Sequence, residues 1–264
     1  MNTFTTDTSE NHGMTNDIIQ KSIPNIKILW TGGFDSTFRV LQLSMLPVVI
    51  QPYYLSDNRK SENNELSAIN SITKLILNRK ETKCELLPIE IIATNQRKLY
   101  PEISDSFRKL VEKETIGSQY EWLACFAKNY NGIELSIEEN TKPFMLMEKY
   151  DSKLQLIQDS IIGDYYVLDK HNTQDIIYTI FGNYHYPLAK VSKLKMKEYY
   201  LKWNCNDIMN LTWFCHNPVN GKPCGLCSPC CQVIKYGMYD RFTKWALIKH
   251  RLLPVRKLLK KICI

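Results

Sequence analysis

A short apolar run followed at once by two glycines and a helical pattern constrains the fold of this chain more than any other feature. Residues 26–30 (IKILW) are long enough for one buried strand, and residues 31–36 (TGGFDS) form a glycine-containing turn. Residues 37–43 then carry apolar side chains at helical spacing. A strand, a glycine turn and a helix present backbone N–H groups and a helix N-terminus to an anion. The pattern therefore predicts a pyrophosphate-binding loop, the alternative being an ordinary turn between a strand and a helix.

Strand-like and helical patterns alternate through the rest of the chain. Further strands are expected over residues 48–55, 85–93 and 133–137. Helices are expected over residues 61–78, 104–114, 117–130, 175–181 and 192–203. This alternation favours an α/β fold, in which helices cover both faces of a parallel sheet. Such sheets bind ligands beyond the carboxyl ends of their strands, where the glycine loop would lie. Residues 138–170 show only short strand-like stretches.

Composition and charge exclude several classes of protein. With 44% hydrophobic and 23% charged residues, the chain is expected to be a folded globular protein. Residues 1–24 are polar and lack the pattern of a secretory signal, so we expect a flexible N-terminal arm and a cytoplasmic location. No apolar run reaches the ~20 residues that a membrane helix needs. The net charge is +7, but the chain before residue 241 is close to neutral, so nucleic acid is not an expected partner.

The positive charge is concentrated in residues 239–264, which have the pattern of a basic amphipathic helix. Their apolar residues recur at three- and four-residue steps: Trp245, Ile248, Leu252, Val255, Leu259 and Ile262. Such a helix suits a protein partner or a membrane surface. It equally suits a helix that docks on its own core or on the other subunit of a homodimer. Pro254 is expected to kink or divide the helix.

Residues 211–238 contain four cysteines separated by eight, two and two residues: Cys215, Cys224, Cys227 and Cys230. Glycines and prolines surround them, and tight turns are what a site needs to aim consecutive sulfurs at one point. The spacing predicts a Cys₄ site for Zn²⁺, since four thiolates with no open position suit a structural metal. An iron–sulfur cluster, or cysteines that are simply reduced or disulfide-bonded, are the alternatives. Cys231 could replace Cys230 as a ligand, and His216 is a further alternative.

The TGGFDS turn resembles the SGGxDS signature of the PP-loop ATP pyrophosphatases, with Thr31 in place of the first serine. That family cleaves ATP between the α and β phosphates, transfers AMP to a substrate oxygen and holds pyrophosphate on the loop. The resemblance implies an adenine-nucleotide α-hydrolase-like, Rossmann-like domain over residues 25–210, with ATP and Mg²⁺ as cofactors. It implies catalytic roles for Asp35 and Ser36. The nucleotide-binding residues that it implies are Trp30, Thr31, Gly32, Gly33, Phe34, Asp35, Ser36 and Thr37.

The glycine loop and the four cysteines together are similar to the 7-cyano-7-deazaguanine synthases of queuosine biosynthesis. Three local matches lie between or beside them: Pro187-Leu188 followed by Lys193, Thr212-Trp213 before Cys215, and Pro223-Cys224-Gly225. Those enzymes use ATP to adenylate 7-carboxy-7-deazaguanine, and ammonia then gives the amide and finally the nitrile, preQ0. The resemblance implies an ATP-dependent, AMP-forming carbon–nitrogen ligase. Its partners would be a small carboxylate, most simply a deazapurine, and an amine or ammonia.

The chain departs from that family at two places, and we therefore expect a divergent member. The DYGQRH segment of the family corresponds to residues 55–60, and its Gly-Arg-Asn segment corresponds to residues 117–119. The substrate-binding residues that the resemblance implies are Arg59, Gly117, Ser118, Gln119 and Lys193. Three alternatives stay open: an enzyme that joins a deazaguanine to a protein amine in bacterial defence, a tRNA-modifying PP-loop enzyme, and a protein that binds ATP without turnover.

Overall fold

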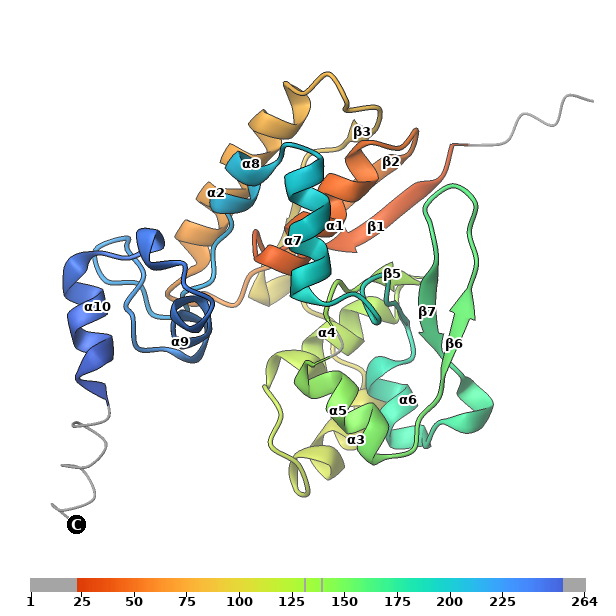
Figure 1. The fold of residues 1–264 in the computed structure, drawn as a ribbon. Helices are drawn as coiled ribbons and strands as arrows, with labels where there is room; N and C mark the ends of the chain where they lie inside the picture. The colour runs from red at the N-terminus through yellow and green to blue at the C-terminus, as the bar shows by residue number, and fades with distance from the viewer. Residues whose placement is uncertain (1–22, 131, 139, 254–264) are drawn as a thin grey trace, which may run out of the picture.

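A parallel sheet lies at the centre of the protein (Figure 1). The computed structural model describes residues 23–130, 132–138 and 140–253. Most of the N-terminal arm expected over residues 1–24, and the basic tail after residue 253, lie outside these ranges. The strands are β1 (Asn25–Leu29), β2 (Val49–Leu55), β3 (Glu85–Leu86), β4 (Glu90–Ile92), β5 (Ile133–Glu134), β6 (Leu154–Ile157), β7 (Tyr165–Leu168) and β8 (Tyr184–His185). The α-helices are α1 (Phe34–Ser44), α2 (Glu62–Leu77), α3 (Pro101–Val111), α4 (Gln119–Ala127), α5 (Lys142–Lys149), α6 (Asp175–Phe181), α7 (Lys193–Lys202), α8 (Asn206–Asn210), α9 (Ser228–Lys235) and α10 (Lys244–Arg251).

The central sheet has the strand order β3-β2-β1-β5-β8, and β4 also pairs with β2. Every pair within it is parallel, with Asn25 opposite Val49 and Ile133 opposite Tyr184. β6 and β7 form a separate antiparallel hairpin. The α/β architecture expected from the alternating pattern is therefore confirmed.

Two hydrophobic cores cover the two faces of the sheet, because successive side chains of a strand point in opposite directions. Ile28 and Trp30 pack into the core that α1, α2, α7 and α8 share, whereas Leu29 packs against the core of α3, α4, α5 and α6. β2 divides in the same way, with Tyr54 on the first side and Tyr53 on the second. Figure 1 shows the two groups of helices on opposite sides of the strands. Strands that are buried on both faces explain why 26–30 and 48–55 are nearly continuous apolar runs.

A buried ion pair fixes α1 to the middle of the sheet. Arg39 of α1 donates from Nε and Nη2 to the two carboxylate oxygens of Glu134 on β5, at 2.8 and 2.6 Å. Both side chains are almost fully buried, at 1% and 2% exposure. Arg39 also donates to the side chain of Gln42 and to the carbonyl of Ile162. The geometry is bidentate and the arginine has further acceptors, as a buried charge requires.

The structure differs from the sequence predictions mainly in short elements. The strand expected over residues 85–93 is split into β3 and β4 at Pro88, whose carbonyl accepts a hydrogen bond from Gln51. The two-residue β8 and the helices α5, α8 and α9 were not predicted. The segment 211–238, expected as a metal-binding loop, contains the helix α9, which begins directly after Cys227.

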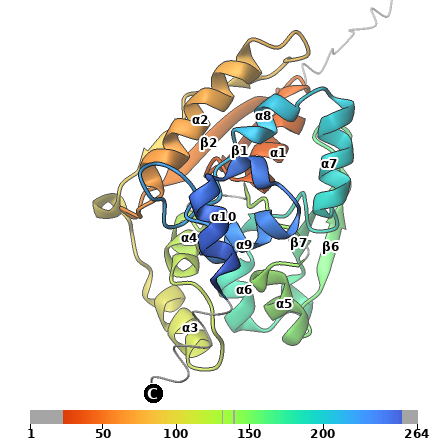
Figure 2. The same cartoon turned by 60° about the vertical axis from the view of Figure 1, so that its left-hand side comes forward.

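The C-terminal segment with α9 and α10 lies to one side of the sheet, beyond the carboxyl end of β1 (Figure 1), and Figure 2 shows these two helices from the front. α10 covers only the first part of the basic helix expected over residues 239–264, since the residues from 254 on are outside the described ranges. Trp245, Ile248 and Leu252 are exposed. None of the helices in the described part of the chain is long and apolar enough to cross a membrane.

Candidate functional site

The glycine loop has a conformation that other residues would adopt only under strain. Gly32 has φ of +68°, in the left-handed region that favours glycine. A Cβ at this position would lie 2.9 Å from the carbonyl oxygen of Glu65 and 3.1 Å from Cγ1 of Ile69, both on α2. Below the loop, the indole Nε1 of Trp30 donates to Oγ1 of Thr37 at 3.0 Å, and both side chains are buried. This hydrogen bond joins the residue before the loop to the first turn of α1 and so holds the two ends of the loop together.

Helix α1 begins immediately after this turn, and its first residues line a cavity. Gly33 is the N-cap, and no side chain in the described part of the chain caps the helix there. The N–H of Thr37 bonds the carbonyl of Gly33, so the N–H groups before Thr37 are those that an α-helix leaves without an intrahelical partner. Ser36 adds a hydroxyl to this end. The arrangement suits an anion such as a phosphate group.

The loop opens into a large cavity of about 840 Å³. Its walls come from β1, β2, α1, α4, α7 and the cysteine-containing segment. The predicted nucleotide-binding residues that line it are Thr31, Gly33, Phe34, Asp35 and Ser36. Arg59, Gln119 and Lys193, predicted to bind the substrate, line it as well, whereas Trp30, Gly32, Thr37, Gly117 and Ser118 do not. Residues far apart in the sequence thus meet around one space of a size that suits a small-molecule ligand.

Asp35 and Lys193 form a charged group at the rim of the loop. Nζ of Lys193, the first residue of α7, lies 3.2 Å from Asp35 and 3.2 Å from Glu138. Burial raises the pKa of Asp35 above its ordinary value, although the Lys193 ammonium opposes the change. Burial works against the charge of Lys193 too, but the two carboxylates outweigh it and raise the pKa of Lys193. Lys193 therefore carries a positive charge beside the N-terminus of α1.

Arg59 brings a second cation to the cavity from the turn after β2. Its Nε lies 2.7 Å from Asp57 and 3.8 Å from Glu65. Its guanidinium carbon is 5.5 Å from the centre of the Tyr54 ring. Burial works against its charge, but Glu65, Tyr54 and Asp57 outweigh it and the pKa of Arg59 is raised. This network holds the arginine in one place at the cavity wall.

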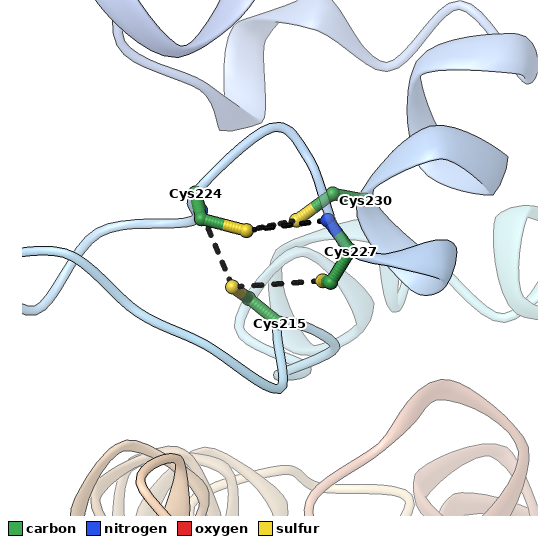
Figure 3. A group of neighbouring side chains, drawn as sticks. All are labelled: Cys215, Cys224, Cys227 and Cys230. Carbon is green, nitrogen blue, oxygen red and sulfur yellow. Dashed lines mark hydrogen bonds between the residues drawn. The ribbon is translucent and has the colours of Figure 1, made fainter. Parts of the chain in front are cut away.

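The four cysteines predicted as metal ligands come together, with their sulfurs turned toward one another (Figure 3). All four sulfur atoms lie within 4.8 Å of one another. Sγ of Cys224 is 3.8 Å from that of Cys230, and Sγ of Cys227 is 3.9 Å from that of Cys215. A tetrahedral zinc ion with bonds of ~2.3 Å requires sulfur separations of ~3.8 Å. These two separations therefore fit a single ion, whereas a cluster of several irons would spread the sulfurs further apart.

The surroundings of the four sulfurs also suit thiolates bound to a cation. Backbone N–H groups of Cys224, Leu226 and Cys227 point at sulfurs of the group, at 3.2 to 3.4 Å. Burial raises the pKa of Cys215 to about 11, and a hydrogen bond from Cys230 lowers the pKa of Cys227 to about 4. Burial thus works against the thiolate form of Cys215, and a bound dication would offset this cost. The four-cysteine group could hold a metal ion such as zinc.

The two alternative ligands lie outside this group. Sγ of Cys231 is 3.7 Å from the carbonyl oxygen of Leu226 and 3.8 Å from Nδ1 of His250. His216 lines the large cavity instead. Helix α9 explains the difference between the adjacent cysteines, because its first turn directs Cys230 toward the other ligands and turns Cys231 away.

Trp213 connects the cysteine group to the glycine loop. Its backbone N–H donates to the carbonyl of Gly32 at 2.8 Å, and its indole Nε1 donates to the carbonyl of Cys215 at 2.8 Å. The ring of Trp213 also lines the cavity. The cysteine-containing segment and the loop are therefore parts of one site.

Sequence reasoning missed most of the cavity wall that this segment supplies. The wall residues from this part of the chain are Thr212, Trp213, Phe214, His216, Pro229, Gln232, Val233, Tyr236, Met238 and Arg241. The match of Thr212-Trp213 to the synthases was the one signal that pointed here. The other residues come to the cavity through the packing of α9 and of the loops on either side of it, which no local pattern reveals.

Comparison of the sequence with protein-family models gives no match, and comparison with curated proteins gives no significant match.

Proposed function

We propose that the protein is an ATP-dependent ligase that adenylates a carboxylate and passes the acyl group to an amine or ammonia. The observation that carries the proposal is the glycine loop at the N-terminus of α1, which opens into a cavity beside Lys193 and which no side chain of the described residues caps. The resemblance of TGGFDS to the PP-loop signature supports ATP as the nucleotide. The resemblance of loop and cysteines together to the 7-cyano-7-deazaguanine synthases supports 7-carboxy-7-deazaguanine, or a related deazapurine, as the carboxylate.

The chemistry of adenylation suits the residues at the loop. A carboxylate reacts with an amine only slowly until one of its oxygens becomes part of a good leaving group, which AMP provides. Pyrophosphate then has to leave from ATP, and the N–H groups of α1 and the hydroxyl of Ser36 would stabilise its developing charge. Lys193 would add a positive charge at the same place. Mg²⁺ would neutralise phosphate charge, and the carboxylates of Asp35 and Glu138, which line the cavity near Lys193, would hold it.

The part of the cavity wall that comes from α4 and β2 suits a planar aromatic substrate. Tyr120, Trp122 and Leu123 of α4 line it together with Tyr53 of β2. Gln119 supplies an amide that can both donate and accept hydrogen bonds. Gln119 is the member of the predicted 117–119 segment that would read the edge of a deazapurine.

Adenylation is tested by following the fate of ATP with 7-carboxy-7-deazaguanine and ammonia. The proposal expects AMP and pyrophosphate, and mass spectrometry of the organic product would distinguish an adenylate, an amide and a nitrile. Ser36→Ala should lower the rate by about 10²–10³-fold, the usual loss for one hydrogen-bond donor to developing charge. Ser71→Ala, on α2 and away from the cavity, is the matched control and should leave the rate unchanged. Release of ADP and phosphate would show that the proposed reaction is wrong.

A further inference from the structure

Among the described residues, four lysine and arginine side chains line the cavity, and two of them form no salt bridge with another described residue. Arg59 and Lys193 are each paired with carboxylates. Arg241 and Lys197 have no carboxylate within ion-pair distance in the part of the chain that the structure describes. Lys197 is exposed, so water can solvate its charge, but Arg241 is half-buried. Burial lowers the pKa of Arg241, and the charge of the adjacent Asp240 offsets this only in part. A half-buried guanidinium that no carboxylate of the described residues contacts directly points to an anion that is supplied by a ligand.

Neighbouring residues hold Arg241 in a defined place. Its Nη1 donates to Oγ1 of Thr212 at 3.3 Å, and its Nη2 donates to the carbonyl of the same residue. Its guanidinium carbon lies 4.7 Å from the centre of the Phe214 ring. These contacts occupy part of the guanidinium and leave other N–H donors of its five available. The side chain is therefore ordered in advance of any ligand, which reduces the entropy cost of binding.

The place that Arg241 occupies is next to the glycine loop. Its partner Thr212 precedes Trp213, and the N–H of Trp213 donates to the carbonyl of Gly32. On the other side, Tyr200 packs edge-on against Phe34 of the loop, with ring centres 6.0 Å apart. Burial raises the pKa of Tyr200, and the nearby charge of Arg241 opposes this rise. Arg241 is thus linked to the loop through Thr212 and Trp213, and its charge is felt at Tyr200, which packs against Phe34.

We propose that Arg241 binds phosphate oxygens of the nucleotide, as a clamp beside the glycine loop. A guanidinium fork fits two oxygens of a phosphate group at once, which an ammonium cannot do. The proposal rests on the proposed function for the identity of the nucleotide. It assigns a ligand-binding role to the segment after the four cysteines, so that the metal-binding unit contributes directly to the chemistry of the loop.

Titration calorimetry with magnesium pyrophosphate tests the clamp. Arg241→Gln should weaken pyrophosphate binding by about 10- to 100-fold, the effect of losing a hydrogen-bonded charge pair. Arg241→Lys keeps the charge but loses the fork, so its affinity should fall between those of the wild type and Arg241→Gln. Arg108→Gln removes the same charge from exposed α3 and should bind as the wild type does. Equal affinity of Arg241→Gln and Arg108→Gln would overturn the proposal.

A measurement on the unaltered protein covers the case in which Arg241→Gln folds poorly. A dicarbonyl reagent modifies accessible arginines, and peptide mass spectrometry gives the rate at each position. Saturating pyrophosphate should slow modification of Arg241 several-fold and leave that of Arg108 unchanged. Equal rates at Arg241 with and without pyrophosphate would overturn the clamp, even if the protein forms AMP. Protection of Arg241 in a protein that forms no AMP would support the clamp and contradict the proposed function.

Discussion

Replacing Gly32 by alanine tests how closely the glycine loop approaches α2. Two costs add at this position. The backbone has φ of +68°, and the left-handed conformation costs an alanine about 1–2 kcal/mol. The new Cβ would also lie 2.9 Å from the carbonyl oxygen of Glu65, and overpacking of this kind costs about 1–3 kcal/mol. We therefore expect the free energy of unfolding to fall by roughly 2–5 kcal/mol.

Gly163 provides a control that separates the two costs. It has φ of +79°, but, apart from its two chain neighbours, no described residue has an atom within 4 Å of the position that a Cβ would take. Gly163→Ala should therefore lose only the backbone term, about 1–2 kcal/mol. Urea unfolding of the three proteins, followed by circular dichroism, measures the difference. Equal destabilisation by the two alanines would show that the loop does not lie against α2 as described, and would weaken the case for a preformed phosphate site.

Three further predictions follow from the metal group, the buried ion pair and the loop carboxylate. Purified protein should contain about one zinc per chain. Removal of the zinc by a chelator should lower the melting temperature and weaken pyrophosphate binding, since Trp213 joins the cysteines to the glycine loop. An unchanged melting temperature after zinc loss would contradict this link between the cysteines and the loop. Arg39→Met should lower the free energy of unfolding by about 3–5 kcal/mol because it leaves Glu134 buried and unpaired. The double variant Arg39→Met, Glu134→Leu should recover most of this loss, and additive losses in the double variant would argue against the ion pair. Because burial raises the pKa of Asp35 above 3.8, the folded protein binds this proton more tightly than the unfolded chain, and the Asp35 contribution to stability falls as pH rises above 3.8. Asp35→Asn should thus gain stability over the wild type at neutral pH but not at about pH 3, and identical pH profiles in thermal melts would refute this.

The parts of the fold that could be predicted are those whose signal is local. Residues 26–30 are apolar except for Lys27 because the strand is buried on both faces, and the two glycines mark the turn that follows. The helix expected over residues 175–181 matches α6, whose bounds follow from its apolar spacing. The cysteine spacing likewise predicted which four sulfurs meet. In each case the residues that carry the signal are neighbours in the chain.

The parts that could not be predicted depend on contacts between distant residues. β8 has only two residues and exists because it pairs with β5, so its own sequence carries almost no strand pattern. Helix α9 was missed because its cysteines were interpreted as loop ligands, although Pro229 in its first turn is a usual helix-start signal. The place of Arg241 at the cavity depends on the packing of Thr212 and Phe214. Gly117 and Ser118, chosen by resemblance alone, do not line the cavity, whereas Gln119 does.

Transfer of oxygen from substrate to nucleotide tests the central claim most directly. If the protein adenylates a carboxylate, one carboxylate oxygen bridges to the phosphorus of AMP and leaves with it when the amine attacks the acyl carbon. With ¹⁸O-labelled 7-carboxy-7-deazaguanine, ATP and ammonia, mass spectrometry should therefore find one ¹⁸O atom in the released AMP. AMP without ¹⁸O would show that water had attacked the nucleotide, and ADP would show cleavage at a different bond. Either result would contradict the account.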